Sequence, residues 1–171
     1  MNDTQTLANL FENALLGMLE RRGEAIRYFA SQDAFDYMKL SVAHWHPDVY
    51  WNLAAKDGQE FDASGYDKDY FSPEEFILLL DYERVPGVAP LLEALEAINE
   101  AAEDNDDDDI MPDIRLTHSA LALAFKRDSV INKLAELLGD KMPTADNLHQ
   151  VIHIHDVDGY CEQNFLAPAD V

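Results

Sequence analysis

The acidic residues are concentrated in one third of this 171-residue chain, and that concentration constrains the fold more than any other feature. The block from 57 to 113 contains 19 of the 34 Asp and Glu residues and only two bases, so it carries −17 of the net charge of −22. Within it, the run from 104 to 109 consists of five aspartates and one asparagine. Burying such a run would cost too much free energy, so we expect a solvated acidic loop there. The whole block should lie on the surface, where its self-repulsion weakens the compact state.

The rest of the chain has an ordinary composition and predicts one folded domain. Residues 1–30 carry a charge of −1 and residues 121–150 a charge of zero. Apolar residues make up 47% of the chain, with eight Phe, seven Tyr and two Trp, which is enough for a hydrophobic core. Because the sequence contains neither an internal repeat nor a linker, we predict a single domain over residues 1–171.

The same features indicate where the protein acts. The sequence has no apolar run of the ~18 residues needed to span a bilayer, and no basic segment followed by an apolar one at its start. A single cysteine, Cys161, cannot form an internal disulfide, which agrees with a reducing compartment. Phosphate groups repel an acidic surface, so neither nucleic acid nor an anionic membrane is an expected direct partner. We therefore predict a cytoplasmic protein.

Apolar periodicity and capping signals predict a mostly α fold: one compact domain of about six to eight helices, with room for a short hairpin near 56–71. Leu7, Phe11 and Met18 share one face of a helix over 4–22, which Gly23 is expected to end. The remaining predicted helices cover 34–42, a stretch starting at Pro47, 72–80, 91–103, 117–126 and 129–138. The 72–80 helix rests on a capping box at 72–75. The stretch 148–154 fits either a helix end or a strand.

The predicted helix over 91–103 has one apolar and one acidic face. Leu91, Leu92, Leu95, Ile98 and Ala102 fall on one side of a helical wheel, and Glu93, Glu96, Glu100 and Glu103 fall on the other. At ~1.5 Å rise per residue the four carboxylates span ~15 Å, a length over which a DNA strand presents about four phosphates. No lysine or arginine occurs from 85 to 114 to compensate this charge. The helix therefore presents a charge density close to that of DNA.

Two simpler interpretations compete with a functional one. Surface helices commonly have a charged outer face, although they usually intersperse bases among the acids. Adaptation to high salt would also produce an acidic protein, but it would spread the acids over the whole surface and reduce the large apolar residues. The uneven distribution of charge in this chain argues against that interpretation.

The histidines near the C-terminus raise the question of a metal site. His149, His153, His155 and Asp156 are ligand types that suit zinc or iron. However, a helix aligns His149 with His153, whereas a strand aligns His153 with His155, so no regular conformation aligns all three. The alternative is a polar edge of the core with hydrogen-bonded or solvated histidines. We predict no metal and no cofactor.

An enzyme is not the expected class. The seven glycines are too dispersed to form a phosphate-binding loop, and neither a Gly-x-Ser-x-Gly nor a His-Glu-x-x-His motif occurs. The acids are so numerous that pairs of them carry no information about catalysis.

The first functional hypothesis is an acidic inhibitor that occupies the nucleic-acid groove of a basic nucleic-acid-binding protein or nuclease. Phage anti-restriction and anti-CRISPR proteins of the DNA-mimic type act in this way, and the likeness is one of charge and size. The predicted binding residues are Glu93, Glu96, Glu100, Glu103, Asp104, Asp106, Asp107, Asp108 and Asp109. A second patch consists of Asp62, Asp67, Asp69, Glu74 and Glu75.

Two alternatives remain open at this point. An immunity protein would neutralise one basic nuclease toxin without following phosphate geometry. A metal-dependent enzyme would use the segment from His149 to Asp156. Separately, Lys126, Arg127, Lys133 and Lys141 make the C-terminal third neutral, so a homodimer could form through that side with its acidic faces outward.

Overall fold

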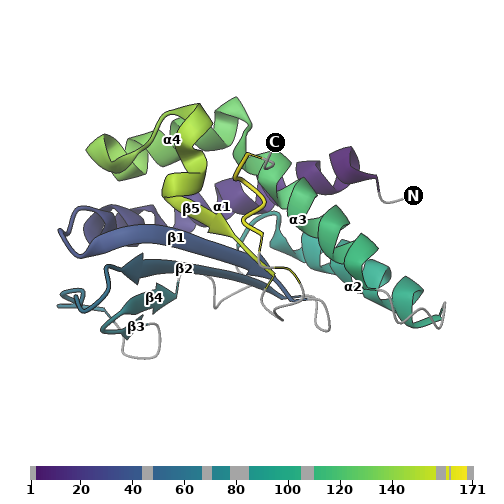
Figure 1. Ribbon diagram of the computed structural model, residues 1–171, viewed down its shortest axis with the longest axis horizontal. Helices are drawn as coiled ribbons and strands as arrows, with labels where there is room; N and C mark the ends of the chain where they lie inside the picture. The colour runs from purple at the N-terminus through teal and green to yellow at the C-terminus, as the bar shows by residue number, and fades with distance from the viewer. Residues whose placement is uncertain are drawn as a thin grey trace.

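The structure, a computed structural model, describes residues 3–43, 48–66, 71–77, 85–104, 110–156, 161 and 163–168. In these residues, helices pack against one face of a mixed sheet whose strand order is β3-β4-β2-β1-β5 (Figure 1). The long helices are α1 (Thr4–Ala30), α2 (Val88–Asp104), α3 (Met111–Phe125) and α4 (Asp128–Leu138). The strands are β1 (Phe35–Val42), β2 (Val49–Ala55), β3 (Phe71–Ser72), β4 (Glu75–Ile77) and β5 (Ile152–Ile154). Two 3-10 helices, η3 (Gly139–Lys141) and η4 (Ala145–Gln150), precede β5.

The fold is therefore α+β, and the prediction of a mostly α domain of six to eight helices was wrong. The predicted helix over 34–42 is β1, and the one expected from Pro47 is β2, with residues 44–47 themselves outside the described residues. In β1, Met38, Leu40 and Val42 are buried at every second position, which is the period of a strand with one face against the core. These two strands pair antiparallel and form the centre of the sheet.

The capping box at 72–75 does not start a helix either. Residues 73 and 74 form a tight turn between β3 and β4, so the predicted helix over 72–80 is wrong for its described part, 72–77. Glu75, expected to cap a helix, instead accepts a hydrogen bond from Asn52 Nδ2 of β2 at 2.8 Å. The hairpin expected near 56–71 is found instead at 71–77, where β3 pairs with β4. Residues 56–66 form turns without strand pairing, and residues 67–70 lie outside the described residues.

The C-terminal half agrees better with its predicted helices. The helices expected at 117–126 and 129–138 are α3 and α4, although α3 begins six residues earlier, at Met111. The ambiguous stretch 148–154 ends as strand β5, which pairs parallel to β1 with Leu40 opposite Ile154. The outer edge of β5 is occupied by the chain that follows, since Phe165 N donates to Ile154 O at 3.0 Å.

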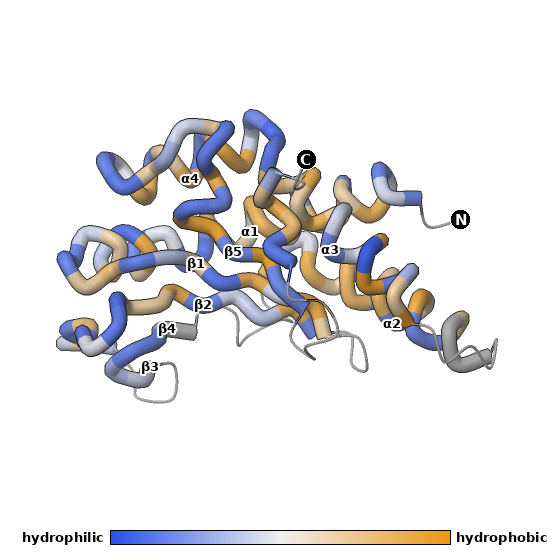
Figure 2. The backbone as a smooth tube through the Cα atoms, in the orientation of Figure 1, coloured by the Kyte–Doolittle hydropathy of each residue, from blue (hydrophilic) through white to orange (hydrophobic). Residues whose placement is uncertain are grey.

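Helix α1 forms the centre of the helical layer. It contacts α2, α3 and α4 and also reaches β2, and the hydrophobic colouring in Figure 2 is heaviest where α1, α2 and α3 come together. The helix does not end at Gly23, as the sequence suggested, but continues to Ala30. Ile26 and Phe29 are 0% exposed beyond that glycine, so burial of their side chains outweighs the helix-breaking tendency of Gly23.

Two glycines set how closely the chain before α2 approaches α1. A Cβ at Gly17 would lie 2.2 Å from the Pro86 carbonyl oxygen. Gly87, with φ +85°, would place a Cβ 2.8 Å from the backbone of Asn13. Only glycine permits this backbone contact at either position, and Gly87 also needs its positive φ. The start of α2 is therefore fixed against α1.

We predict that Gly17→Ala destabilises the protein strongly. The added methyl group collides with a backbone carbonyl that cannot move aside without displacing α2, so the free energy of unfolding should fall by about 2 kcal/mol or more. Urea unfolding followed by circular dichroism measures the change. The matched control is Gly23→Ala in the same helix, whose Cβ would lie 3.2 Å from a flexible Leu137 methyl. Its free energy of unfolding should stay within about 1 kcal/mol of the wild type. Equal stability of the two variants would contradict the close contact.

Candidate functional site

The acidic face predicted on the 91–103 helix exists on α2. Leu91, Leu95 and Ile98 are 2%, 2% and 6% exposed and pack into the core. Glu93, Glu96 and Glu100 are exposed on the other side of the same helix. The long apolar contacts hold the helix, and hence the backbone that carries the three glutamates, in one position.

The three exposed glutamates lie along one side of the helix axis. They are separated by three and four residues, which gives about 10 Å from the first to the last at ~1.5 Å per residue. A DNA strand presents about three phosphates over that length. Of the other predicted residues on this site, Glu103 and Asp104 belong to α2 but their side chains are not described, and Asp106, Asp107, Asp108 and Asp109 lie outside the described residues.

Three basic side chains in the described part of the chain pair with acids away from α2. Arg127 contacts Glu12, while Arg27 and Lys133 lie 3.6 Å and 3.1 Å from Glu136. All three contacts lie around α1 and α4. No ion pair reaches the three exposed glutamates of α2 within the described ranges, so no described base compensates their charge.

The contact between Arg127 and Glu12 joins the start of α4 to α1. Ser129 Oγ also donates to the Glu12 carboxylate. The hydrogen bond from Ser129 and the one from Arg127 lower the pKa of Glu12. Two of the four basic residues expected to form a dimer surface, Arg127 and Lys133, are thus engaged within one chain. The homodimer stays a prediction.

The second predicted patch is separate from the first. The β3–β4 hairpin lies toward the opposite end of the molecule from the C-terminal end of α2 (Figure 1). The segment before Asp62 meets this hairpin, because Phe61 N donates to Pro73 O at 2.8 Å. Glu74 is exposed in the hairpin turn, Glu75 is half-buried, and Asp67 and Asp69 lie outside the described residues.

Asp62 has a local structural task. Its carboxylate accepts hydrogen bonds from the Ser64 hydroxyl at 2.6 Å and the Ser64 amide at 3.0 Å, which lower the pKa of Asp62. The Gln32 side chain binds both the amide and the carbonyl of Asp62, at 2.7 and 2.9 Å. This carboxylate holds a turn, so it is less available to a partner than the glutamates of α2.

The predicted metal candidates do not converge. His153 stacks on Tyr37 with ring centroids 4.1 Å apart, and its ring is nearly perpendicular to that of His155 at 5.7 Å. Asp156 is 7% exposed and accepts a hydrogen bond from the Cys161 amide. Among the residues that the structure describes, no three His, Cys, Asp or Glu side chains are grouped as a metal ion requires.

A fourth histidine, which the sequence did not single out, is the most buried of those described. His118 of α3 is 1% exposed. Its Nδ1 lies 2.9 Å from the Ile114 carbonyl oxygen, its Nε2 lies 3.1 Å from the His155 carbonyl oxygen, and its ring stacks on Phe165. Because a neutral imidazole has one N–H, it donates to only one of these carbonyls. His118 therefore ties α3 to the chain that leaves β5.

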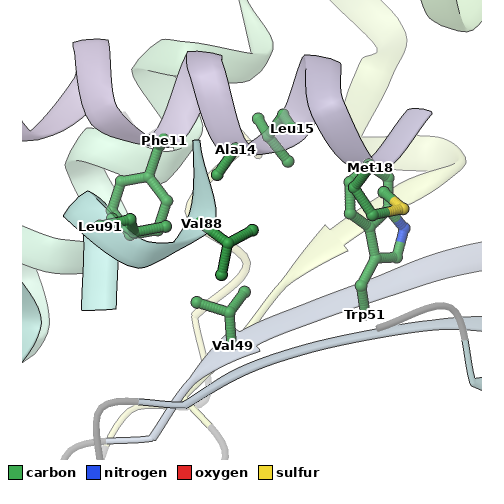
Figure 3. A pocket seen from close by; sticks show the side chains of 8 residues that line it. All are labelled: Phe11, Ala14, Leu15, Met18, Val49, Trp51, Val88 and Leu91. Carbon is green, nitrogen blue, oxygen red and sulfur yellow. The ribbon is translucent and has the colours of Figure 1, made fainter. Parts of the chain in front are cut away.

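A small cavity between α1, α2 and β2 is the other internal feature (Figure 3). Its volume of about 20 Å³ admits little more than one water molecule. The lining side chains are apolar: Phe11, Ala14, Leu15, Met18, Val49, Trp51, Val88 and Leu91. Trp51 Nε1 is buried and has no hydrogen-bond partner among the residues that the structure describes. The cavity is a gap in the core and not a ligand site.

Comparison with protein-family models, curated proteins and solved structures finds no match to this chain. A search of the described helices for a bilayer-spanning segment also finds none of sufficient length and apolarity.

We predict that salt stabilises the protein. Between about 10 and 150 mM NaCl the repulsion within the acidic block is increasingly screened, because the Debye length falls from ~30 to ~8 Å. The melting temperature should rise by about 2–4 °C, which corresponds to roughly 1 kcal/mol for a chain of this size. Differential scanning calorimetry measures it. A triple variant with Glu93, Glu96 and Glu100 changed to Gln should respond less to salt, and a flat response of the wild type would show that the charges are already paired.

We also predict that the pKa of the His118 imidazole lies below the usual value for histidine. Burial lowers the pKa of its imidazole, and the hydrogen bond that the ring donates to the Ile114 carbonyl oxygen and the charge of Asp156 offset this only in part. NMR titration of the ring protons should therefore give a midpoint under about 6.5. A lowered pKa in the folded state means that the contribution of His118 to stability is present above 6.5 and is lost as pH falls toward the folded pKa. A midpoint above 6.5 would mean that the two carbonyls stabilise the imidazolium more than burial penalises it.

Proposed function

We propose that the protein is an acidic cytoplasmic inhibitor that binds a basic nucleic-acid-binding protein, or a nuclease, through the outer face of α2. The observation that carries the proposal is the row of Glu93, Glu96 and Glu100, exposed and without an ion pair to any other described residue. Such charge repels its neighbours and weakens the fold, so its presence on a fixed helix favours a binding role.

The physical basis of the binding would be substitution of carboxylates for phosphates. A helix fixed by its buried face presents its charges with little loss of backbone entropy on binding. Opposite charges on the target's nucleic-acid groove would steer the encounter and accelerate association. The acidic run 104–109, which begins at the last residue of α2, holds five further carboxylates in the sequence.

The identity of the target can be tested by affinity capture. Host lysate is passed over the immobilised protein and eluted with a salt gradient, and the eluted proteins are identified by mass spectrometry. A nucleic-acid-binding protein that is released at moderate salt and displaced by duplex DNA supports mimicry. A single nuclease that binds regardless of DNA would instead indicate an immunity protein.

We predict that reversing the three charges of α2 abolishes target binding. Changing Glu93, Glu96 and Glu100 to Lys replaces attraction by repulsion, and each close charge contact contributes about 1.5 kcal/mol or more, so affinity should fall by at least about 100-fold. Surface plasmon resonance against the captured target measures the loss, and circular dichroism checks the fold.

The matched control makes the same change in net charge at three acids outside α2. Glu20, Asp57 and Asp140 are exposed and have no ion pair within the described ranges, so changing these three to Lys alters the net charge equally. This control should keep most of the affinity. If both triple variants bound the target equally well, α2 would not be the binding surface.

A further inference from the structure

A surface cleft lies where three segments distant in the sequence meet. It is lined by Lys126 and Ile131 at the junction of α3 and α4, by Ala145, Asp146 and Leu148 of η4, and by Leu166, Ala167 and Pro168 near the C-terminus. Its volume is about 470 Å³. Sites for small molecules commonly enclose about 300–1,000 Å³, so the cleft is large enough for one.

The walls of the cleft are held in place by their own hydrogen bonds. In η4, Asn147 N donates to Thr144 O at 2.8 Å, and the Asn147 side chain donates to Thr144 Oγ1 at 2.9 Å. In the C-terminal stretch, Asn164 Oδ1 accepts from the amides of Ile154 and Leu166, both at 3.1 Å. A cleft with fixed walls requires little ordering when a ligand enters.

The lining combines an apolar floor with two opposite charges. Leu148 and Leu166 are 2% and 5% exposed and form the buried part, and Ile131 is half-buried beside them. Lys126 and Asp146 also line the cleft and are exposed, and neither has an ion pair to another described residue. The cleft thus offers one ammonium, one carboxylate and an apolar surface.

We propose that this cleft binds a small zwitterion with an apolar side chain, such as an apolar amino acid or a dipeptide of apolar residues. The ligand carboxylate would contact Lys126, the ligand ammonium would contact Asp146, and the side chain would cover Leu148 and Leu166. A net charge of −22 disfavours a simple anion, whereas a zwitterion carries no net charge to be repelled. The site is on the α3–α4 side and does not depend on the role proposed for α2.

Binding should be weak, because exposed charge pairs contribute little. A dissociation constant of about 1 mM is expected. We would titrate the ¹⁵N-labelled protein with L-leucine and with Leu-Leu up to about 20 mM and follow the amide shifts of Ile131, Leu148 and Ala167. We expect saturating shifts at these amides with either compound. The compound that binds more tightly shows whether the cleft accommodates one residue or two. No shift with either would overturn the proposal.

Two analogues test the zwitterion itself. 3-Methylbutylamine lacks the carboxylate of leucine, and 4-methylpentanoate lacks its ammonium. Each should bind about threefold to fivefold more weakly than leucine, the loss expected for one exposed charge pair. If 4-methylpentanoate bound as tightly as leucine, Asp146 would have no part in recognition and the proposal would fail.

Substitutions locate the contacts. Lys126→Gln and Asp146→Asn should each weaken leucine binding by about threefold to fivefold. Lys141→Gln, which removes the same charge from a residue that does not line the cleft, should leave the affinity unchanged. Equal affinities of all three variants would place the ligand elsewhere.

Discussion

Burial of α1 is the constraint on which the rest of the structure depends. This helix contacts α2, α3 and α4, and it also touches the sheet at β2. Leu19, Ile26 and Phe29 are 0% exposed, so much of its surface is inaccessible to water. The contact of Gly17 with the Pro86 carbonyl brings the chain before α2 onto α1 at a distance that a side chain would not allow. The orientation of the acidic helix thus depends on residues of α1 that carry no charge.

The ion pairs of the described residues lie away from the acidic helix α2. The few bases in the described residues that form ion pairs contact Glu12 and Glu136, where α1 meets α4. There the Glu12 carboxylate receives hydrogen bonds from both Arg127 and Ser129, so its charge is well compensated. Attraction is therefore concentrated around α1 and α4, and repulsion is concentrated at α2. The two effects are separated in space, and the core between them is apolar.

The helices could be predicted from the sequence, whereas the strands could not. In β1 the residues Phe35, Met38 and Val42 satisfy helical spacing, while Met38, Leu40 and Val42 satisfy strand spacing. Such a short segment is decided by its neighbours, and pairing with β2 on one side and β5 on the other selects the strand. The turn at residues 73–74 is a similar case, because a proline followed by acids suits both a helix start and a tight turn.

The acidic face of α2 was predictable because an amphipathic helix of this length has a strong 3.6-residue period. The other site features depend on contacts between distant segments, which carry no local signal. His118 lies in an apolar stretch and meets the His155 carbonyl only when α3 packs beside β5. Similarly, Lys126 and Asp146 are twenty residues apart and border one cleft because η4 returns beside the end of α3. Sequence periodicity could identify a charged helix face, but not a cleft formed by three separate segments.

For the proposed inhibitor, carboxylates fixed on a folded helix should bind a basic groove more tightly than the same number of carboxylates on a loop. An acidic loop can approach a basic groove, but ordering its backbone costs about 1–2 kcal/mol per residue, which offsets much of the attraction. In α2 the backbone is already ordered in the folded protein, because burial of Leu91, Leu95 and Ile98 offsets the loss of backbone entropy during folding. Glu93, Glu96 and Glu100 therefore need to order only their side chains on binding. A rigid row of carboxylates follows from the apolar face of α2 as much as from its acidic one.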